Sequence, residues 1–141
     1  MLDKACKPLV KGGDIKPVVA ANGLKRFHDD WSLQLTGVQR IVLASPSVAN
    51  PHVCMLTVNF DIDQSGPIVD ALNGWAAMQD PPLLPQDKGY KGSSGATNWS
   101  WSGDTAQSHT GMVFAAQKTP DGKPVGRTYD VATLLFSQTG S

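Results

Sequence analysis

Residues 52–62, HVCMLTVNFDI, place an apolar side chain at every second position. Successive side chains of a strand point to opposite sides, so these apolar residues share one face of an extended chain. That face carries Cys54, Leu56, Val58, Phe60 and Ile62. The other face carries most of the polar residues, which predicts a half-buried strand of an antiparallel sheet. A chain built around such a strand must cover one side of a sheet.

The segments around this strand predict its neighbours. Residues 38–45, VQRIVLAS, are β-branched and apolar, and we expect them to form an antiparallel hairpin with 52–62. Three more strands are predicted at 97–103, 110–118 and 127–137. Helices are predicted at 2–10, 14–22 and 65–79, from apolar spacing and from Gly and Pro stop signals. The Gly- and Ser-rich stretch 86–96 reads as part of a loop of about 15 residues.

Composition sets the balance between helix and sheet. All twelve acidic residues are Asp, which prefers caps and turns, and the chain holds 14 Gly and 10 Pro. We therefore predict a single α+β domain over residues 1–141, with a five-stranded antiparallel sheet made of a hairpin, a helix and a three-stranded meander. The N-terminal and central helices are expected to pack on one face. The β-β-α-β-β-β order of residues 38–137 resembles the topology of PAS-like and profilin-like domains, without any family motif.

Charge and motifs exclude several functions. Twelve basic residues balance twelve acidic ones and are scattered, whereas nucleic-acid binding needs clustered positive charge. No apolar run approaches the roughly 20 residues that span a bilayer. Walker and GxGxxG motifs are missing from the sequence, so we expect no nucleotide cofactor.

The two cysteines, Cys6 and Cys54, have no zinc-ligand spacing. Cys6 shares an apolar stripe with Leu9 and Val10, and Cys54 lies on the apolar face of its strand. Both side chains thus point inward and can meet in one core. We predict a disulfide, and with it a periplasmic or secreted protein. Two buried thiols in a cytosolic protein are the alternative.

Asp61 and Asp63 leave the strand one residue apart, just before Ser65-Gly66-Pro67. A calcium loop starting at Asp61 would need a carboxylate at its twelfth position, where Leu72 stands, so no metal site is predicted. The Asp-x-Asp pattern is also similar to that of haloacid-dehalogenase-type phosphatases, which implies a metal-dependent phosphoester hydrolase as one alternative. The favoured interpretation is that both carboxylates face water on the polar side and that the segment ends in a helix cap. We therefore assign no catalytic residues.

Trp99 and Trp101 lie on one face of a predicted strand, about 7 Å apart. They either cover the core beneath the helices or form an exposed aromatic platform for a partner. The adjacent stretch carries Tyr90 between Lys88 and Lys91, which suits a recognition edge. These five residues are the predicted binding site.

The favoured function is a small, non-enzymatic, extracytoplasmic domain that binds a protein partner, similar in style to bacterial inhibitor and immunity proteins. A small-ligand or sensing domain of PAS-like topology is the alternative. It requires a closed apolar pocket lined by Phe60, Trp75, Phe114 and Phe136. A homodimer is possible if an edge strand such as 38–45 pairs across a two-fold axis.

Overall fold

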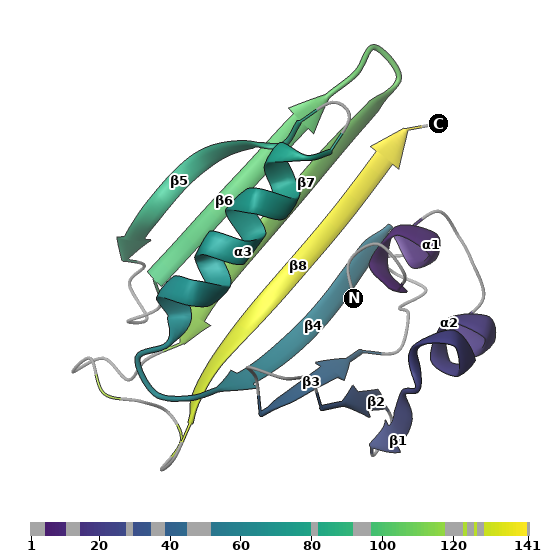
Figure 1. The fold of residues 1–141 in the computed structure, drawn as a ribbon. Coiled ribbons are helices and arrows are strands. Elements are labelled where there is room, and N and C mark those ends of the chain that lie inside the picture. Colours follow the sequence, from purple (N-terminus) through teal and green to yellow (C-terminus); the bar gives the residue numbers. More distant parts are fainter. Residues whose placement is uncertain are drawn as a thin grey trace.

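The computed structural model contains one eight-stranded antiparallel sheet with strand order β1-β2-β3-β4-β8-β7-β6-β5 (Figure 1). The structure describes residues 5–10, 15–27, 30–34, 39–44, 52–79, 82–91, 97–117, 123, 126 and 129–140. At 27, 87–91 and 140 it describes the backbone alone. The sheet consists of two meanders of four strands each, which meet where β4 pairs with β8.

The N-terminal meander has three short strands, one strand of eight residues and two short helices. Its elements are α1 (Lys7–Val10), α2 (Ile15–Asn22), β1 (Lys25–Phe27), β2 (Asp30–Leu33), β3 (Arg40–Leu43) and β4 (Val53–Phe60). Gly23 ends α2 in the left-handed region, at φ 66°, where glycine pays no steric penalty. Leu24 N–H then donates to the Val19 carbonyl, 3.1 Å away.

The C-terminal meander has long strands and follows a single helix. Its elements are α3 (Ser65–Ala77), β5 (Leu84–Lys91), β6 (Thr97–Asp104), β7 (Ser108–Gln117) and β8 (Asp130–Gly140). Helix α3 carries the chain from β4 across one face of β8, β7 and β6 to the far edge, where β5 begins (Figure 1). Val69, Leu72 and Ala76 form its buried stripe, at the three- and four-residue spacing of one helix face.

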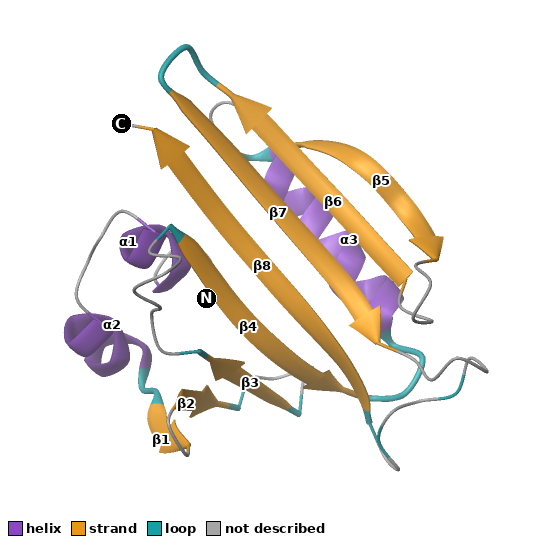
Figure 2. Ribbon diagram, turned by 180° about the vertical axis from the view of Figure 1, so that it is seen from behind, coloured by secondary structure: helices purple, strands orange, loops and turns teal. Residues whose placement is uncertain are grey.

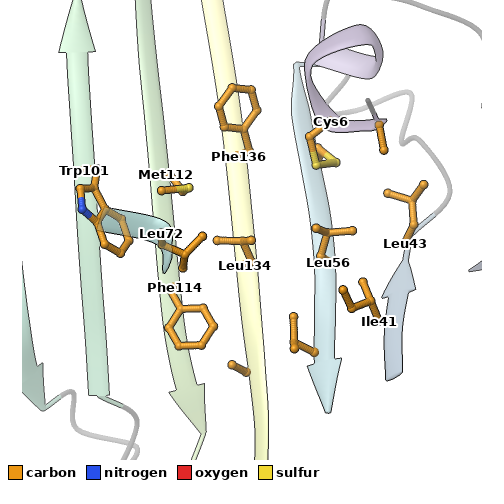
Figure 3. Packing of buried hydrophobic residues seen from close by; sticks show 14 of the residues in the cluster. Cys6, Ile41, Leu43, Leu56, Leu72, Trp101, Met112, Phe114, Leu134 and Phe136 are labelled. Carbon is orange, nitrogen blue, oxygen red and sulfur yellow. A yellow bond between two sulfur atoms is a disulfide. The ribbon is translucent and has the colours of Figure 1, made fainter. Parts of the chain in front are cut away.

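The core lies on one face of the sheet, which we call the inner face. Register pairs align its side chains across strands: Leu43 with Leu56, Cys54 with Phe136, and Leu134 with Phe114. Figure 3 shows the side chains of Leu43, Leu56, Phe114, Leu134 and Phe136 on the same side of the sheet, with Leu72 of α3 among them. Phe60, Phe114 and Phe136 are at most 1 % exposed, so this face is closed to water along the centre of the sheet.

Cys6 and Cys54 meet at disulfide distance, with their sulfur atoms 2.10 Å apart, as the sequence predicted (Figure 3). Both residues are buried, and the bond ties the turn that leads into α1 to β4 on the inner face. Helix α1 has four residues, too few to be stable alone. The cross-link therefore supplies the tertiary anchor that such a short helix needs.

A turn at the end of β4 joins the two meanders. Asp63 adopts φ 63°, a left-handed conformation that Asp tolerates better than most side chains. Its N–H donates to Oδ2 of Asp130, 2.8 Å away, at the start of β8. Asp130 is 2 % exposed, so this carboxylate is a buried acceptor that holds the turn against the sheet.

The predicted five-stranded α+β fold is wrong. The sheet has eight strands and the fold is mostly sheet with a few short helices, so the resemblance to PAS-like and profilin-like domains also fails. The three missed strands are β1, β2 and β5. The first two have three and four residues, too few for a periodic signal. Strand β5 contains Pro85 and Gly89, which an edge strand with register shifts accommodates.

The predicted dimer contact through residues 38–45 also fails. Strand β3 occupies 40–43 and has hydrogen-bonded neighbours on both sides, β2 and β4, so it offers no free edge. No helix in the described ranges is long and apolar enough to cross a membrane.

Candidate functional site

An apolar groove of about 510 Å³ runs between α3, the segment that follows it, and β6. Three residues of α3, spaced four apart on one helix face, form one wall: Val69, Asn73 and Ala77. Trp99 and Trp101 of β6 form the floor. The second wall is the run 82–85, Pro-Leu-Leu-Pro, which leads into β5. We call this hollow the α3–β6 groove.

The two tryptophans differ in burial although both lie on the inner face. Trp101 is 2 % exposed and pairs in register with the buried Met112. Trp99 is half-buried and packs its ring against Phe114, with centroids 5.8 Å apart. Trp101 thus belongs to the core, and Trp99 is the aromatic ring that the groove leaves partly accessible.

One polar contact fixes the groove's geometry. Trp101 Nε1–H donates to Oδ1 of Asn73, 2.8 Å away, and so satisfies the indole of a buried ring. Asn73 is exposed, and its amide borders the groove. The groove therefore combines apolar walls with one amide positioned by the floor.

The second wall is anchored at its base and exposed at its rim. Leu83 is 3 % exposed, and its N–H donates to the Ala76 carbonyl at 3.0 Å. A Cβ on Gly103 would come within 3.0 Å of the Pro82 carbonyl oxygen, so the glycine permits this segment to cross β6 closely. Leu84, by contrast, is 61 % exposed.

The predicted recognition edge falls on a strand rather than in a loop. Residues 84–91 form β5, and its backbone pairs Lys88 with Trp99 and Tyr90 with Asn98. Strand β5 also includes Lys91, opposite Thr97. Residues 92–96 of the predicted loop lie outside the described residues, as do the side chains of 87–91. The structure thus brings the backbone of this edge beside the two tryptophans.

Asp61 and Asp63 both make hydrogen bonds that hold the turn after β4. Oδ1 of Asp61 accepts from Nε2 of Gln39 at 2.9 Å, and both residues of the acidic pair are exposed. Asp63 contributes its backbone N–H to Asp130. Within the described ranges, no cluster of three or more His, Cys or Asp residues is arranged to hold a metal ion.

Of the four aromatic residues proposed to line a closed pocket, Phe60, Phe114 and Phe136 are buried in the core, and Trp75 is half-buried against it. The Phe60 and Phe114 rings lie 6.4 Å apart, and Trp75 meets Phe136 edge-on at 5.9 Å. Trp75 and Phe136 also border a smaller, more polar hollow of about 200 Å³ near Lys7, whose Nζ donates to Gln79 Oε1. The α3–β6 groove was missed because its second wall, 82–85, reads in the sequence as a helix stop.

Comparison of the chain with protein families, with curated proteins and with solved structures found no match.

Proposed function

We propose that this chain is a non-catalytic, extracytoplasmic domain that binds a partner protein by taking apolar side chains of the partner into the α3–β6 groove. The observation that carries the proposal is the half-buried Trp99 at the floor of an apolar groove of about 510 Å³. Aromatic residues in such partly desolvated hollows dominate binding energy at protein interfaces.

The rim favours a protein over a small molecule. Leu84 and Pro85 both line the groove; Leu84 is 61 % exposed, and Pro85 is exposed as well. A small ligand held inside the groove would leave these apolar side chains in water. A protein surface laid across the groove would cover them as well, which is how an interface core and its surroundings exclude solvent.

The buried cross-link supports the proposed compartment. A disulfide between Cys6 and Cys54 persists in the periplasm or outside the cell, where thiols are not kept reduced.

Selection of displayed peptides on the purified protein, followed by affinity measurement, tests the groove. Ala77 lines the groove and Ala71 does not, although both are exposed on α3. Ala77→Arg should fill the groove and weaken a selected peptide by about 2 kcal/mol or more, roughly thirtyfold. Ala71→Arg, the matched control, should bind like the wild type. Peptides that bind Ala77→Arg as tightly as the wild type would refute the groove as the binding site.

A small apolar ligand is the second candidate, because the groove volume falls in the range of about 300–1,000 Å³ that such sites occupy. Native mass spectrometry of protein purified from its source distinguishes the two. If the wild type carries a bound small molecule that the Ala77→Arg variant lacks, the small-ligand function is favoured. If the wild type has the mass of the protein alone and binds the selected peptides, the protein partner is favoured.

A further inference from the structure

The sheet has a second face, which α1 and α3 leave uncovered. We call it the outer face. It consists of positions 40 and 42 of β3, the odd-numbered positions of 53–59 in β4, of 131–139 in β8 and of 111–117 in β7, and the even-numbered positions of 98–102 in β6. Figure 2 shows these strands in front, with α3 behind them. Alternation along each strand turns these side chains away from the core.

Apart from Arg40 at its edge, every outer-face position carries an uncharged residue. Its centre is an apolar row that crosses three strands, because Met55 pairs with Leu135 and Leu135 pairs with Val113. Met55 is 41 % and Leu135 36 % exposed. The other positions of β4 and β6–β8 on this face carry Thr, Ser, Asn, Gln, Ala, Val and Gly. Sheet faces that stay in water normally carry interspersed charges that oppose association. This face has the composition of a surface that is covered.

We propose that the outer face binds the outer face of a second copy of this chain. In a two-fold symmetric interface the same patch occurs on both subunits. A charged residue near the axis therefore faces the same residue of the other subunit, which has the same charge. An uncharged centre avoids this repulsion, whereas a different partner could have been matched with complementary charge. The inference concerns a surface separate from the α3–β6 groove, so either can fail without the other.

The size of the outer face suits a dimer. Strands β3, β4, β8, β7 and β6 lie side by side, and about 4.8 Å between strands gives a width of about 24 Å. Positions 53–59 give a similar length, so each copy offers about 600 Å². Two copies would bury about 1,200 Å² in total, at the lower end of specific interfaces.

Two opposite corners of the outer face carry charges of opposite sign, so that in a symmetric dimer each can meet the other. Among the described residues of β3, β4 and β6–β8, the titratable side chains on this side are Arg40, Asp104 and His109. Arg40 lies beside Asn59 at one end of β3. Asp104 lies at the diagonally opposite corner, where its carboxylate contacts Nδ1 of His109. Suppose that the two-fold axis lies in the plane of the interface, along the diagonal that joins the other two corners. The strands of the two sheets then cross near right angles. In this arrangement each Arg40 lies close to the corner of the partner that carries Asp104.

Sedimentation velocity of the purified protein over a range of concentrations tests the dimer. The wild type should sediment as a dimer, and Met55→Lys as a monomer with an unchanged circular dichroism spectrum. Met78→Lys is the matched control: Met78 is 79 % exposed but lies at the end of α3, off the outer face, so it should remain dimeric. A wild type that is monomeric at every concentration, or a Met55→Lys variant as dimeric as the wild type, would overturn the proposal.

Charge reversal provides a second test that leaves the apolar centre intact. Arg40→Asp should weaken the dimer by about tenfold, and adding Asp104→Arg in the same chain should restore most of the affinity. Recovery in the double variant would support the interface in this orientation. Additive weakening by the two substitutions would overturn it.

Discussion

The two meanders of the sheet are stabilised by different means. Strands β1–β3 have three or four residues, whereas β5–β8 have eight to eleven. The long strands bury large aromatic rings beneath a thirteen-residue helix. Beside its three short strands, the N-terminal meander has one eight-residue strand, β4, two small helices, and a cross-link that joins Cys6 to Cys54 of β4. Burial scales with the surface that an element offers, so the smaller half requires covalent help that the larger half does not.

The largest expected effect is in the C-terminal meander. Phe114 is fully buried on β7 and contacts the rings of Phe60 and Trp99. Phe114→Ala should lower the free energy of unfolding by about 4 kcal/mol, because it leaves a large cavity. Phe114→Leu, which keeps most of the volume, should cost about 1 kcal/mol. Urea denaturation measures the free energy of unfolding of both variants. Equal losses for the two would show that cavity volume does not determine the stability of the C-terminal meander.

Removing the cross-link should have the next largest effect. The double variant Cys6→Ala and Cys54→Ala opens a loop closed over 48 residues, and we expect a loss of about 3 kcal/mol. Native-state hydrogen exchange should show the loss of protection concentrated in α1 and β4, with β6 and β7 retained. Uniform loss over all strands would mean that the two meanders are not separately supported.

Substitutions at the junction between the two meanders should have an intermediate effect on stability. Asp130→Ala removes the buried acceptor of the Asp63 N–H and should cost about 2 kcal/mol. Asp61→Ala in the same turn is the matched control: its hydrogen bond with Gln39 is exposed, so thermal unfolding should change little. Equal effects of the two substitutions would contradict a special role for the buried carboxylate.

The smallest effect is expected where α3 meets β6. Trp101→Phe keeps most of the apolar burial but removes the Nε1–H that donates to Asn73, so we expect a loss of about 1 kcal/mol. Asn73→Ala should add little on the Trp101→Phe background, since both remove the same bond. A full additive loss in the double variant would show that Asn73 acts through some other contact.

The sequence was informative where elements are long and periodic. Strand β4, helix α3 and strands β6–β8 lie where spacing predicted them, and the inward side of β4 placed Cys54 correctly opposite Cys6. It was uninformative where tertiary pairing overrides local preference. Residues 84–91 contain Pro, Asp and Gly, which are poor strand formers, yet pair with β6 at the sheet edge.

The part of the site that depends on spacing along one strand could be predicted, and the part that depends on tertiary packing could not. A period of two placed Trp99 and Trp101 on one face, and that face is the groove floor. Which ring stays accessible depends on where α3 and 82–85 cross the sheet, and spacing along a strand contains no information about such crossings. Asn73 was missed because a polar residue on the exposed side of a helix looks like an ordinary surface position.

The pairing of β4 with β8 also determines when the sheet can be completed. Phe60 lies opposite Asp130, so β4 cannot pair on this side until β8 has been made. At about 5–20 residues per second, synthesis leaves the edge of β4 open for several seconds. Both cysteines precede that interval, so oxidation can join Cys6 to Cys54 while half of the sheet does not yet exist. An early sulfur bridge would then hold the nascent N-terminal portion compact during the time when an unpaired strand edge invites aggregation.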